Sequence, residues 1–205
     1  LILAISLSLI NMSYAQKADD ILEKLSNKTN SYKNIKASFA YKMVNLEAEI
    51  DETTNGTLLV DGNKYHLNIA GQEVICDGET LWTYLVDSEE VQINEVSEED
   101  GFSPSKLLSS YNDDYTAKME EDKIENGVTF YQLHLKPKDK NSNFDYVVLY
   151  VNKELLQLSE FIMHDFDDNV FSYEIKQFVT DGEIPTDSFT FDTAKYPNVE
   201  VIDMR

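Results

Sequence analysis

The feature that most constrains the fold is a long series of short apolar and aromatic runs, separated by turn residues, that begins at Ile35. Within a run, large side chains alternate with polar or smaller ones, as at Trp82 and Tyr84, which Thr83 separates. This period of two is typical of a β-strand with one buried face. Asp61-Gly62-Asn63 and Asp77-Gly78-Glu79 are turn sequences that join neighbouring runs closely. The pattern therefore predicts an antiparallel meander.

So many consecutive hairpins with little intervening helix favour one strongly curved antiparallel sheet, an unclosed β-barrel, over a sandwich of two equal sheets. The chain is thus expected to be mainly β. A final segment with apolar residues at 188–191 and 199–202 closes it. The candidate strands are 36–46, 54–61, 64–70, 72–77, 80–86, 90–96, 115–121, 128–137, 144–151, 156–165 and 170–178.

Two stretches show helical instead of strand character. Apolar residues recur at helical spacing over 18–31, with solvent-type residues between them, which predicts an amphipathic helix. Ser103 and Pro104 are favourable at the N-cap and first position of a second, short helix over 103–111. We expect both helices to cover an apolar sheet face as a lid. The candidate lid residues are Ile21, Leu22, Leu25, Leu107 and Leu108.

The first ten residues are apolar and uncharged, and Ser13 and Ala15 fit the positions before a signal-peptidase site. Residues 1–15 are therefore interpreted as a secretory signal peptide that is incomplete at its start. The expected mature chain is one domain over 16–205. Because no cysteine stands near Gln16 to accept a lipid, this domain is expected to be soluble in the periplasm after export.

The formal net charge is -21, and residues 1–15 carry none of it. Such an acidic domain is a poor partner for nucleic acid, and anionic membrane surfaces would repel it. A single cysteine, Cys76, excludes an intramolecular disulfide, and its place in an apolar run predicts a small buried hydrophobe. The composition therefore favours an exported, acidic protein without covalent cross-links.

Motifs that carry catalysis or bind metals fail when they are tested one by one. The three histidines stand singly in different candidate strands, and no nucleophile elbow or phosphate-binding glycine loop occurs. Residues 165–169 match the first side-chain positions of a calcium loop, but Val170 and Lys176 replace its required glycine and glutamate. A hairpin turn is the better interpretation of 165–169. The sequence therefore predicts no catalytic residue, no metal site and no cofactor.

Large apolar side chains are more numerous along the candidate strands than a thin sheet needs. One interpretation is an ordinary core; the other is a hydrophobic groove that binds a ligand. On the second interpretation, the fluorescence of Trp82, the only tryptophan, should respond to acylated peptide. The candidate groove residues are Phe39, Tyr41, Leu58, Val60, Tyr65, Leu67, Trp82 and Tyr84.

Several stretches, in order and spacing, make the chain similar to a known family. The most specific is Cys76–Tyr84, which contains Asp-Gly-x-x-Leu-Trp-x-Tyr. The others are Ala18–Leu25, Ala37–Lys42, Asn55–Val60, Ser103–Leu108, Ser188–Phe191 and Val199–Val201. With these stretches, nearly the whole mature chain resembles the outer-membrane lipoprotein carrier proteins of the LolA type.

The resemblance implies an unclosed β-barrel under a helical lid, with no catalytic residue and no cofactor. It implies a carrier that takes acylated lipoproteins from an inner-membrane ABC transporter and shuttles them to the outer membrane, where a receptor is a further candidate partner. We expect a monomer. The family commonly has an arginine in the loop that corresponds to Asp61–Lys64, and this chain lacks it. Control of the lid is therefore expected to differ, with Lys64 as the candidate substitute.

Two other functions fit parts of the sequence. A regulatory module of the same fold could sense lipids or lipoproteins, although it would be expected to bring an additional domain. A periplasmic lipid-modifying enzyme is the other alternative, and the lack of any paired nucleophile and base argues against it. Lipid or lipoprotein retained on the purified protein would favour the carrier.

Overall fold

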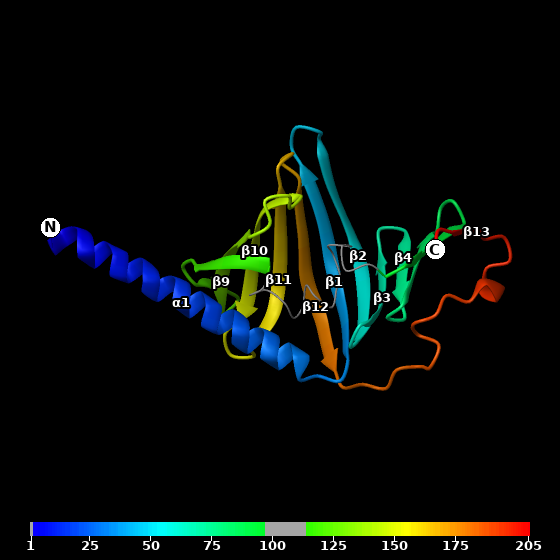
Figure 1. The fold of residues 1–205 in the computed structure, drawn as a ribbon, viewed down its shortest axis with the longest axis horizontal. Helices are drawn as coiled ribbons and strands as arrows, with labels where there is room; N and C mark the ends of the chain where they lie inside the picture. The colour runs from blue at the N-terminus through cyan, green and yellow to red at the C-terminus, as the bar shows by residue number, and fades with distance from the viewer. Residues whose placement is uncertain (1, 97–113) are drawn as a thin grey trace. The chain divides into compact units, whose positions relative to one another are not determined.

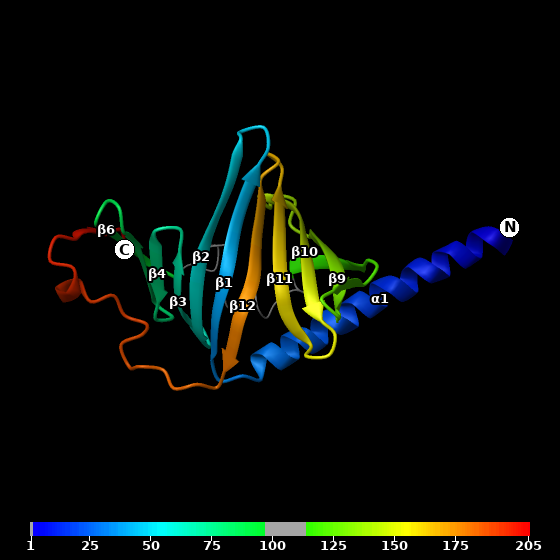
Figure 2. The same cartoon turned by 180° about the vertical axis from the view of Figure 1, so that it is seen from behind.

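The computed structural model describes residues 2–96 and 114–205, which form one α-helix, one 3₁₀ turn and thirteen strands (Figures 1 and 2). The first elements are α1 (Ile2–Asn30), β1 (Ile35–Asn45), β2 (Ile50–Asp61), β3 (Lys64–Ile69), β4 (Gln72–Cys76), β5 (Thr80–Leu85) and β6 (Glu90–Glu95). The others are β7 (Tyr115–Met119), β8 (Lys123–Glu125), β9 (Val128–Pro137), β10 (Phe144–Asn152), β11 (Gln157–Asp165), β12 (Val170–Thr180), η1 (Thr193–Lys195) and β13 (Glu200–Asp203).

The strands follow one hydrogen-bonded order, β13-β6-β5-β4-β3-β2-β1-β12-β11-β10-β9-β7, with β8 paired to β9. The hairpin pairs from β2 to β6 and from β9 to β12 are antiparallel, and β13 joins β6 in parallel. Because β13 and β7 stand at different ends of this order, the sheet is unclosed. The predicted fold class, mainly β with one unclosed, largely antiparallel sheet, is confirmed.

Most predicted strands agree with the structure to within two residues at their ends, but β2 begins at Ile50, four residues before the predicted start, and two further details differ. The helix extends over Ile2–Asn30, beyond the predicted 18–31. Strand β8 was not predicted, because its three residues contain only one apolar side chain and are too few to show a period. The predicted short helix over 103–111 lies outside the described residues. In the described part of the chain, no helix is both long and apolar enough to cross a membrane.

The chain divides into two compact units, which we describe separately. The helical unit contains the described residues in 2–31, 42–52 and 114–174. The terminal unit contains the described residues in 32–41, 53–96 and 175–205. The boundary passes through β1, β2 and β12, each of which contributes residues to both units.

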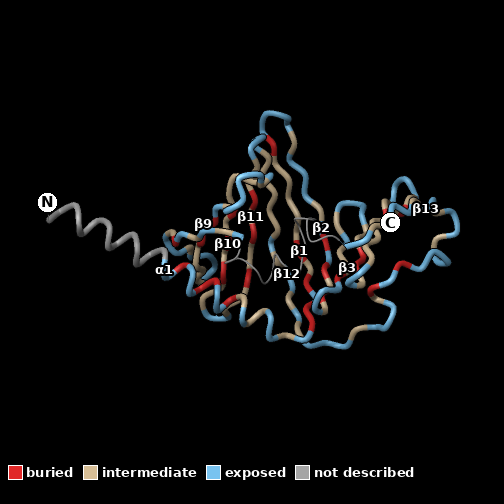
Figure 3. The backbone as a smooth tube through the Cα atoms, in the orientation of Figure 1, coloured by how far each residue is buried: buried red, intermediate tan, exposed pale blue. Residues whose placement is uncertain are grey.

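In the helical unit, α1 packs on β7 and β11 (Figures 1 and 3). Leu22 and Leu25 are completely or almost completely buried there, and each such burial is worth about 1.5–3 kcal/mol. Lys28 near the end of α1 also donates a hydrogen bond from Nζ to the carbonyl oxygen of Leu155. The side chains opposite one another in the sheet register below include Met119, Leu133, Leu149 and Phe161. The helix therefore completes the core of this unit.

In the terminal unit, Gly56 on β2 allows the ring of Phe39 on β1 to lie directly against the sheet. A Cβ atom at residue 56 would collide with this ring and would stand 2.8 Å from the carbonyl oxygen of Asn68. The second contact is with backbone, so it cannot be relieved by a change of side-chain rotamer. The close approach explains a glycine inside a strand, where glycine is otherwise unfavourable.

After β12 the chain continues through an irregular segment, residues 181–199, which contains η1 and which we call the clasp segment. Its beginning is fixed by the buried side chain of Asn34. Asn34 Oδ1 accepts a hydrogen bond from the Gly182 N–H (3.0 Å), and Asn34 Nδ2 donates to the Gly182 carbonyl oxygen (2.9 Å). The Asp181 N–H donates to the backbone carbonyl of Asn34 (3.0 Å). These bonds satisfy a buried amide and set the direction of the clasp segment.

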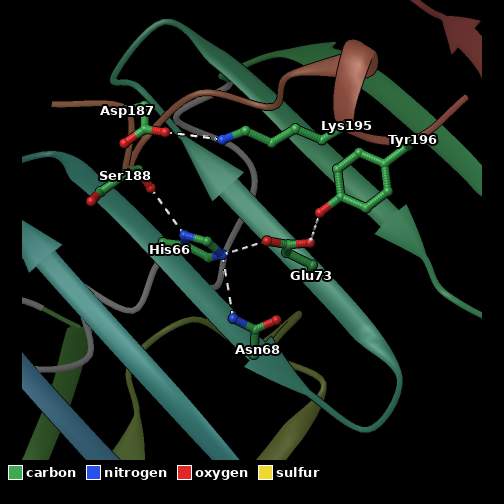
Figure 4. Close-up of polar contacts among 7 residues, drawn as sticks. All are labelled: His66, Asn68, Glu73, Asp187, Ser188, Lys195 and Tyr196. Carbon is green, nitrogen blue, oxygen red and sulfur yellow. Dashed lines mark hydrogen bonds and ion pairs between the residues drawn. The ribbon is translucent and has the colours of Figure 1, made fainter. Parts of the chain in front are cut away.

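Polar contacts then tie the clasp segment to β3 and β4 (Figure 4). His66 Nδ1 lies 2.9 Å from the carbonyl oxygen of Ser188, and His66 Nε2 lies 2.8 Å from Glu73 Oε1. The other carboxylate oxygen of Glu73 accepts a hydrogen bond from the Tyr196 hydroxyl (2.9 Å). Glu73 thus bridges the sheet histidine and the clasp tyrosine.

Aromatic packing accompanies these polar contacts. The ring of Tyr84 on β5 lies 5.4 Å from that of Phe191 and 4.7 Å from that of Tyr196, measured between centroids. Phe191 and Tyr196 stack on one another at 4.7 Å. The cluster to which they belong also contains Ile75, Trp82, Val91 and Val199. One face of strands β4–β6 is therefore covered by the chain's own clasp segment.

Gly56→Ala should destabilise the protein by about 1–3 kcal/mol, because overpacking here forces Phe39 and the β3 backbone to move. The free energy of unfolding in urea would measure the loss. Gly182→Ala is the matched control, since a Cβ at residue 182 meets no atom within 4 Å. Equal stability of the Gly56→Ala variant and the wild type would contradict the packing described for Phe39.

Burial and the hydrogen bond to Glu73 raise the pKa of Tyr196 from its usual 10 to about 12. Its contribution to stability is therefore complete below pH 10 and is lost as the pH rises to about 12. Tyr196→Phe should cost on the order of 1 kcal/mol at pH 8 and should reduce the loss of stability between pH 10 and 12. Denaturation measured across this range would test this, with Tyr32→Phe as the control. A variant with an unchanged alkaline profile would refute the assignment.

Candidate functional site

The register of the terminal unit determines which side chains share a face. Leu58 is opposite Leu67, which is opposite Val74, and Val60 is opposite Tyr65, which is opposite Cys76. Residues opposite one another in antiparallel strands project to the same side of the sheet. Cys76 is in turn opposite Leu81 on β5. We call the resulting surface the Leu58 face; from β2 to β5 its members are Leu58, Val60, Tyr65, Leu67, Val74, Cys76 and Leu81.

Phe39 and Tyr41 extend this face onto β1. Phe39 lies against Gly56, which precedes Leu58 by two residues and so points to the same side. Tyr41 follows Phe39 by two residues and projects to the same side in its turn. Six of the eight predicted groove residues are therefore brought together. Of these, Phe39, Leu58, Val60 and Tyr65 are buried, and Tyr41 and Leu67 are half-buried.

Trp82 and Tyr84 lie on the opposite face, which we call the Trp82 face. Trp82 is opposite Ile75 and Ile93, and Tyr84 is opposite Glu73 and Val91. Both belong to the cluster beneath the clasp segment. The prediction that they share a groove with Tyr65 and Leu67 is wrong, because a difference of one residue in register moves a side chain to the other side of the sheet.

The structure adds Val74, Cys76 and Leu81 to the Leu58 face, and the sequence analysis missed them as site residues. The Asp77-Gly78-Glu79 turn is the sequence feature that could have identified them. It sets the register of β4 against β5 and so decides which side of the sheet each side chain of these strands faces. Cys76 is almost completely buried, as predicted. Burial raises the pKa of its thiol, the Gly78 N–H opposes this rise and the charge of Asp77 adds to it. Cys76 is thus a neutral apolar side chain of the face.

The Leu58 face offers burial of apolar groups as its chemistry. None of the side chains that define it on β1–β5 is Asp, Glu, Lys, Arg or His. The same side of the sheet is polar around them, at Gln72, Thr83, Glu90, Gln92 and Asn94. Over residues 2–96 and 114–205, no three His, Cys, Asp or Glu side chains gather as metal ligands would. The surface suits a flexible apolar ligand, which needs area more than directed hydrogen bonds.

The predicted lid residues are placed in part. Ile21, Leu22 and Leu25 are buried, and α1 packs on β7 and β11 within the helical unit. Leu107 and Leu108 lie outside the described residues. Whether α1 moves to admit a ligand stays a prediction.

Comparison with known proteins gives this apolar surface a context. The family model described as outer membrane lipoprotein carrier protein LolA matches residues 30–192. An outer-membrane lipoprotein carrier protein of Francisella philomiragia is 28% identical over 203 residues, covering 91% of this chain and 93% of its own. One of Shewanella frigidimarina is 27% identical over 209 residues, covering 100% of this chain and 94% of its own.

Solved structures agree on the fold. An uncharacterized conserved protein of Thermus thermophilus superposes with a TM-score of 0.59 at 11% identity, covering 90% of this chain and 98% of that one. A putative outer membrane lipoprotein-sorting protein domain of Vibrio parahaemolyticus does so with a TM-score of 0.50 at 14% identity, covering 86% and 97%. The matched residues 30–192 contain the Leu58 face, the Trp82 face and the start of the clasp segment. With most of its length matched in this way, the chain belongs to the outer membrane lipoprotein carrier protein LolA family.

Proposed function

We propose that this protein binds the acyl chains of lipoproteins on the Leu58 face and carries them through the periplasm from the inner to the outer membrane. The observation that carries the proposal is a continuous uncharged apolar face in a member of a lipoprotein carrier family. An inner-membrane ABC transporter that releases lipoproteins and an outer-membrane receptor are the partners we propose with it. This role requires a binding surface and no catalytic residue.

The free energy gained by burying an acyl chain favours a binding face of which only part is available to the ligand. Each methylene moved out of water is worth about 0.8 kcal/mol, so a chain of about 16 carbons yields roughly 12 kcal/mol when completely buried. Complete burial of three such chains would exceed the practical ceiling of about 18–21 kcal/mol and would prevent release. Leu58, Val60 and Tyr65 are already buried, whereas Tyr41 and Leu67 still have surface to cover. Binding would therefore gain only part of the maximum.

The negative charge of the protein favours a role as a shuttle between membranes and disfavours a role as a protein that stays bound to one membrane. The net charge of -21 disfavours prolonged residence at an anionic bilayer surface, since like charges repel within a Debye length. A carrier that leaves one membrane for another benefits from weak adhesion to both. A lipid-sensing module would share the Leu58 face but would pass its signal to a partner. Native mass spectrometry of the protein during transfer between membrane fractions distinguishes the carrier from the sensing module. Only a carrier should lose its bound ligand to the receiving membrane.

Leu67 and Leu59 form a matched pair for testing the site. Both are half-buried leucines on neighbouring strands, but Leu67 lies on the Leu58 face, and Leu59 is opposite His66 on the Trp82 face. Leu67→Glu should weaken binding of a diacylated peptide by about tenfold or more, since it places a charge against the acyl chain. Leu59→Glu should change the affinity by less than about twofold. Calorimetric titration measures both, and unfolding in urea verifies that both variants are folded.

The two variants also decide between the faces. If Leu59→Glu impairs binding and Leu67→Glu does not, acyl chains bind on the Trp82 face and the proposed site is wrong. Trp82 fluorescence gives a second readout. Because Trp82 lies beneath the clasp segment, we expect it to be nearly unchanged by a ligand on the Leu58 face.

The lid role of α1 makes a paired prediction. Leu25 is almost completely buried, so Leu25→Ala should cost the empty protein about 2–4 kcal/mol. If α1 competes with acyl chains for apolar surface, the same variant should bind diacylated peptide more tightly than the wild type. Thermal unfolding and calorimetric titration of the same samples measure both effects. Ile75→Ala, buried beneath the clasp segment on the Trp82 face, is the control and should lose stability without a gain in affinity. Lost stability with unchanged affinity for Leu25→Ala would mean that α1 is ordinary core.

A further inference from the structure

Two hairpin turns of the helical unit lie side by side at one end of the sheet (Figures 1 and 2). One joins β1 to β2, and the other joins β11 to β12. The buried side chain of Asn45 connects them. Its Nδ2 atom donates to the carbonyl oxygen of Asp167 (3.1 Å) and to Asn169 Oδ1 (2.7 Å). The two turns therefore form one structural element.

Each turn is also held by its own hydrogen bonds. Asn45 Oδ1 accepts from the Ala48 N–H (2.9 Å) in the first turn. In the second, the Asp165 carboxylate accepts from the N–H groups of Asp167 (2.9 Å) and Asn169 (2.8 Å) and from Asn169 Nδ2 (2.7 Å). Burial opposes ionisation of Asp165, but these bonds outweigh it and keep its pKa below the usual value. The backbone at both tips is thus set before any partner arrives.

On this braced element stand two large apolar side chains in solvent. Leu46 is 85% exposed in the first turn, and Phe166 is 66% exposed in the second. We call them the tip pair. Neither contributes much to the fold, because most of its surface remains in water. Exposed apolar groups held on a rigid support are typical of contacts that bury them in a partner, since little conformational entropy is then lost on binding.

Acidic side chains surround the tip pair. Glu47 and Glu49 follow Leu46, and Asp167 and Asp168 follow Phe166; all four residues are exposed. Carboxylates at this position oppose insertion into a bilayer, where basic residues would be needed for attraction to anionic lipids. They complement a protein surface in which Lys or Arg borders an apolar pocket. Charge thus selects a protein over a membrane as the partner.

We infer that the tip pair docks into an apolar pocket, bordered by Lys or Arg, on a protein partner. The contact itself is independent of the Leu58 face. The partner's role as a protein that loads or receives acylated cargo rests on the proposed function. Leu46 and Phe166 would supply the buried anchors, and the four carboxylates would orient the approach and reject acidic surfaces.

Site-specific photocrosslinking tests this inference in cells that make the protein. A photoreactive phenylalanine analogue is placed at residue 46 or 166 and, as a control, at residue 124 or 155. Ile124 (73% exposed) and Leu155 (53%) are exposed apolar residues of the same unit that stand away from the tips. We expect one protein to be linked from both 46 and 166 and not from 124 or 155. Its linked peptide should be apolar and adjoin Lys or Arg residues.

Affinity for that identified protein, once purified, gives the quantitative test. Leu46→Ser/Phe166→Ser should weaken binding by at least about tenfold, whereas Ile124→Ser/Leu155→Ser should change it less than about twofold. Glu47→Lys/Asp167→Lys should also weaken binding to this protein, and the difference in affinity between this variant and the wild type should decrease as salt is added. Binding of diacylated peptide should be unchanged in all three variants. Failure of peptide binding in the wild type would refute the carrier function and leave the docking result standing.

Three results would overturn the inference. The first is equal crosslinking from the tips and from the control residues. The second is crosslinking from the tips to lipid alone. The third is flotation of the protein with phosphatidylethanolamine vesicles that is lost in Leu46→Ser/Phe166→Ser, which would identify the tips as a membrane-inserting element.

Discussion

The antiparallel register of β2–β6 is the constraint on which the two faces of the terminal unit depend. Leu58, Leu59 and Val60 are all apolar, so the composition of β2 does not decide which of them points to which side. The short connection between Asp61 and Lys64 decides it, because it pairs Val60 with Tyr65 and Leu59 with His66. A slip of one residue would place Leu59 among the apolar side chains and Leu58 opposite a histidine. Gly56 contributes by leaving room for Phe39 to pack against the sheet in this register.

The two faces that result offer different kinds of contact. The clasp segment is held on the Trp82 face by directed bonds, and its removal would leave Glu73 and His66 without partners they now have. Such bonds are costly to break when a polar group loses its partner, so this cover is specific and lasting. The Leu58 face is built of apolar side chains, whose burial is non-directional. An apolar ligand can bind such a face and leave it without breaking directed bonds, which suits the proposed carrier function.

The sequence predicted most of the strands, because alternation and glycine-containing turns are local signals that the fold preserves. The face of Trp82 and Tyr84 was not predictable in this way, since it depends on how β4 and β5 pair across residues 77–79 and not on either strand alone. The clasp segment has no periodicity, and its position is set by Asn34, Glu73 and His66, which are distant in sequence. Strand β13 pairs in parallel with β6, so no hairpin turn in the sequence indicates this pairing.

At the hairpin tips, the usual distribution of polar and apolar residues is reversed between neighbours. Asn45 is buried and Leu46 is exposed. A buried leucine stabilises a fold by about 1.5–3 kcal/mol, and Leu46 leaves most of that contribution unused. Asn45, by contrast, is fully engaged in holding the two turns together. An arrangement that uses a buried side chain to join two turns and places an apolar side chain in water does not maximise stability. It is understandable if the joined turns must present Leu46 and Phe166 to something outside the chain.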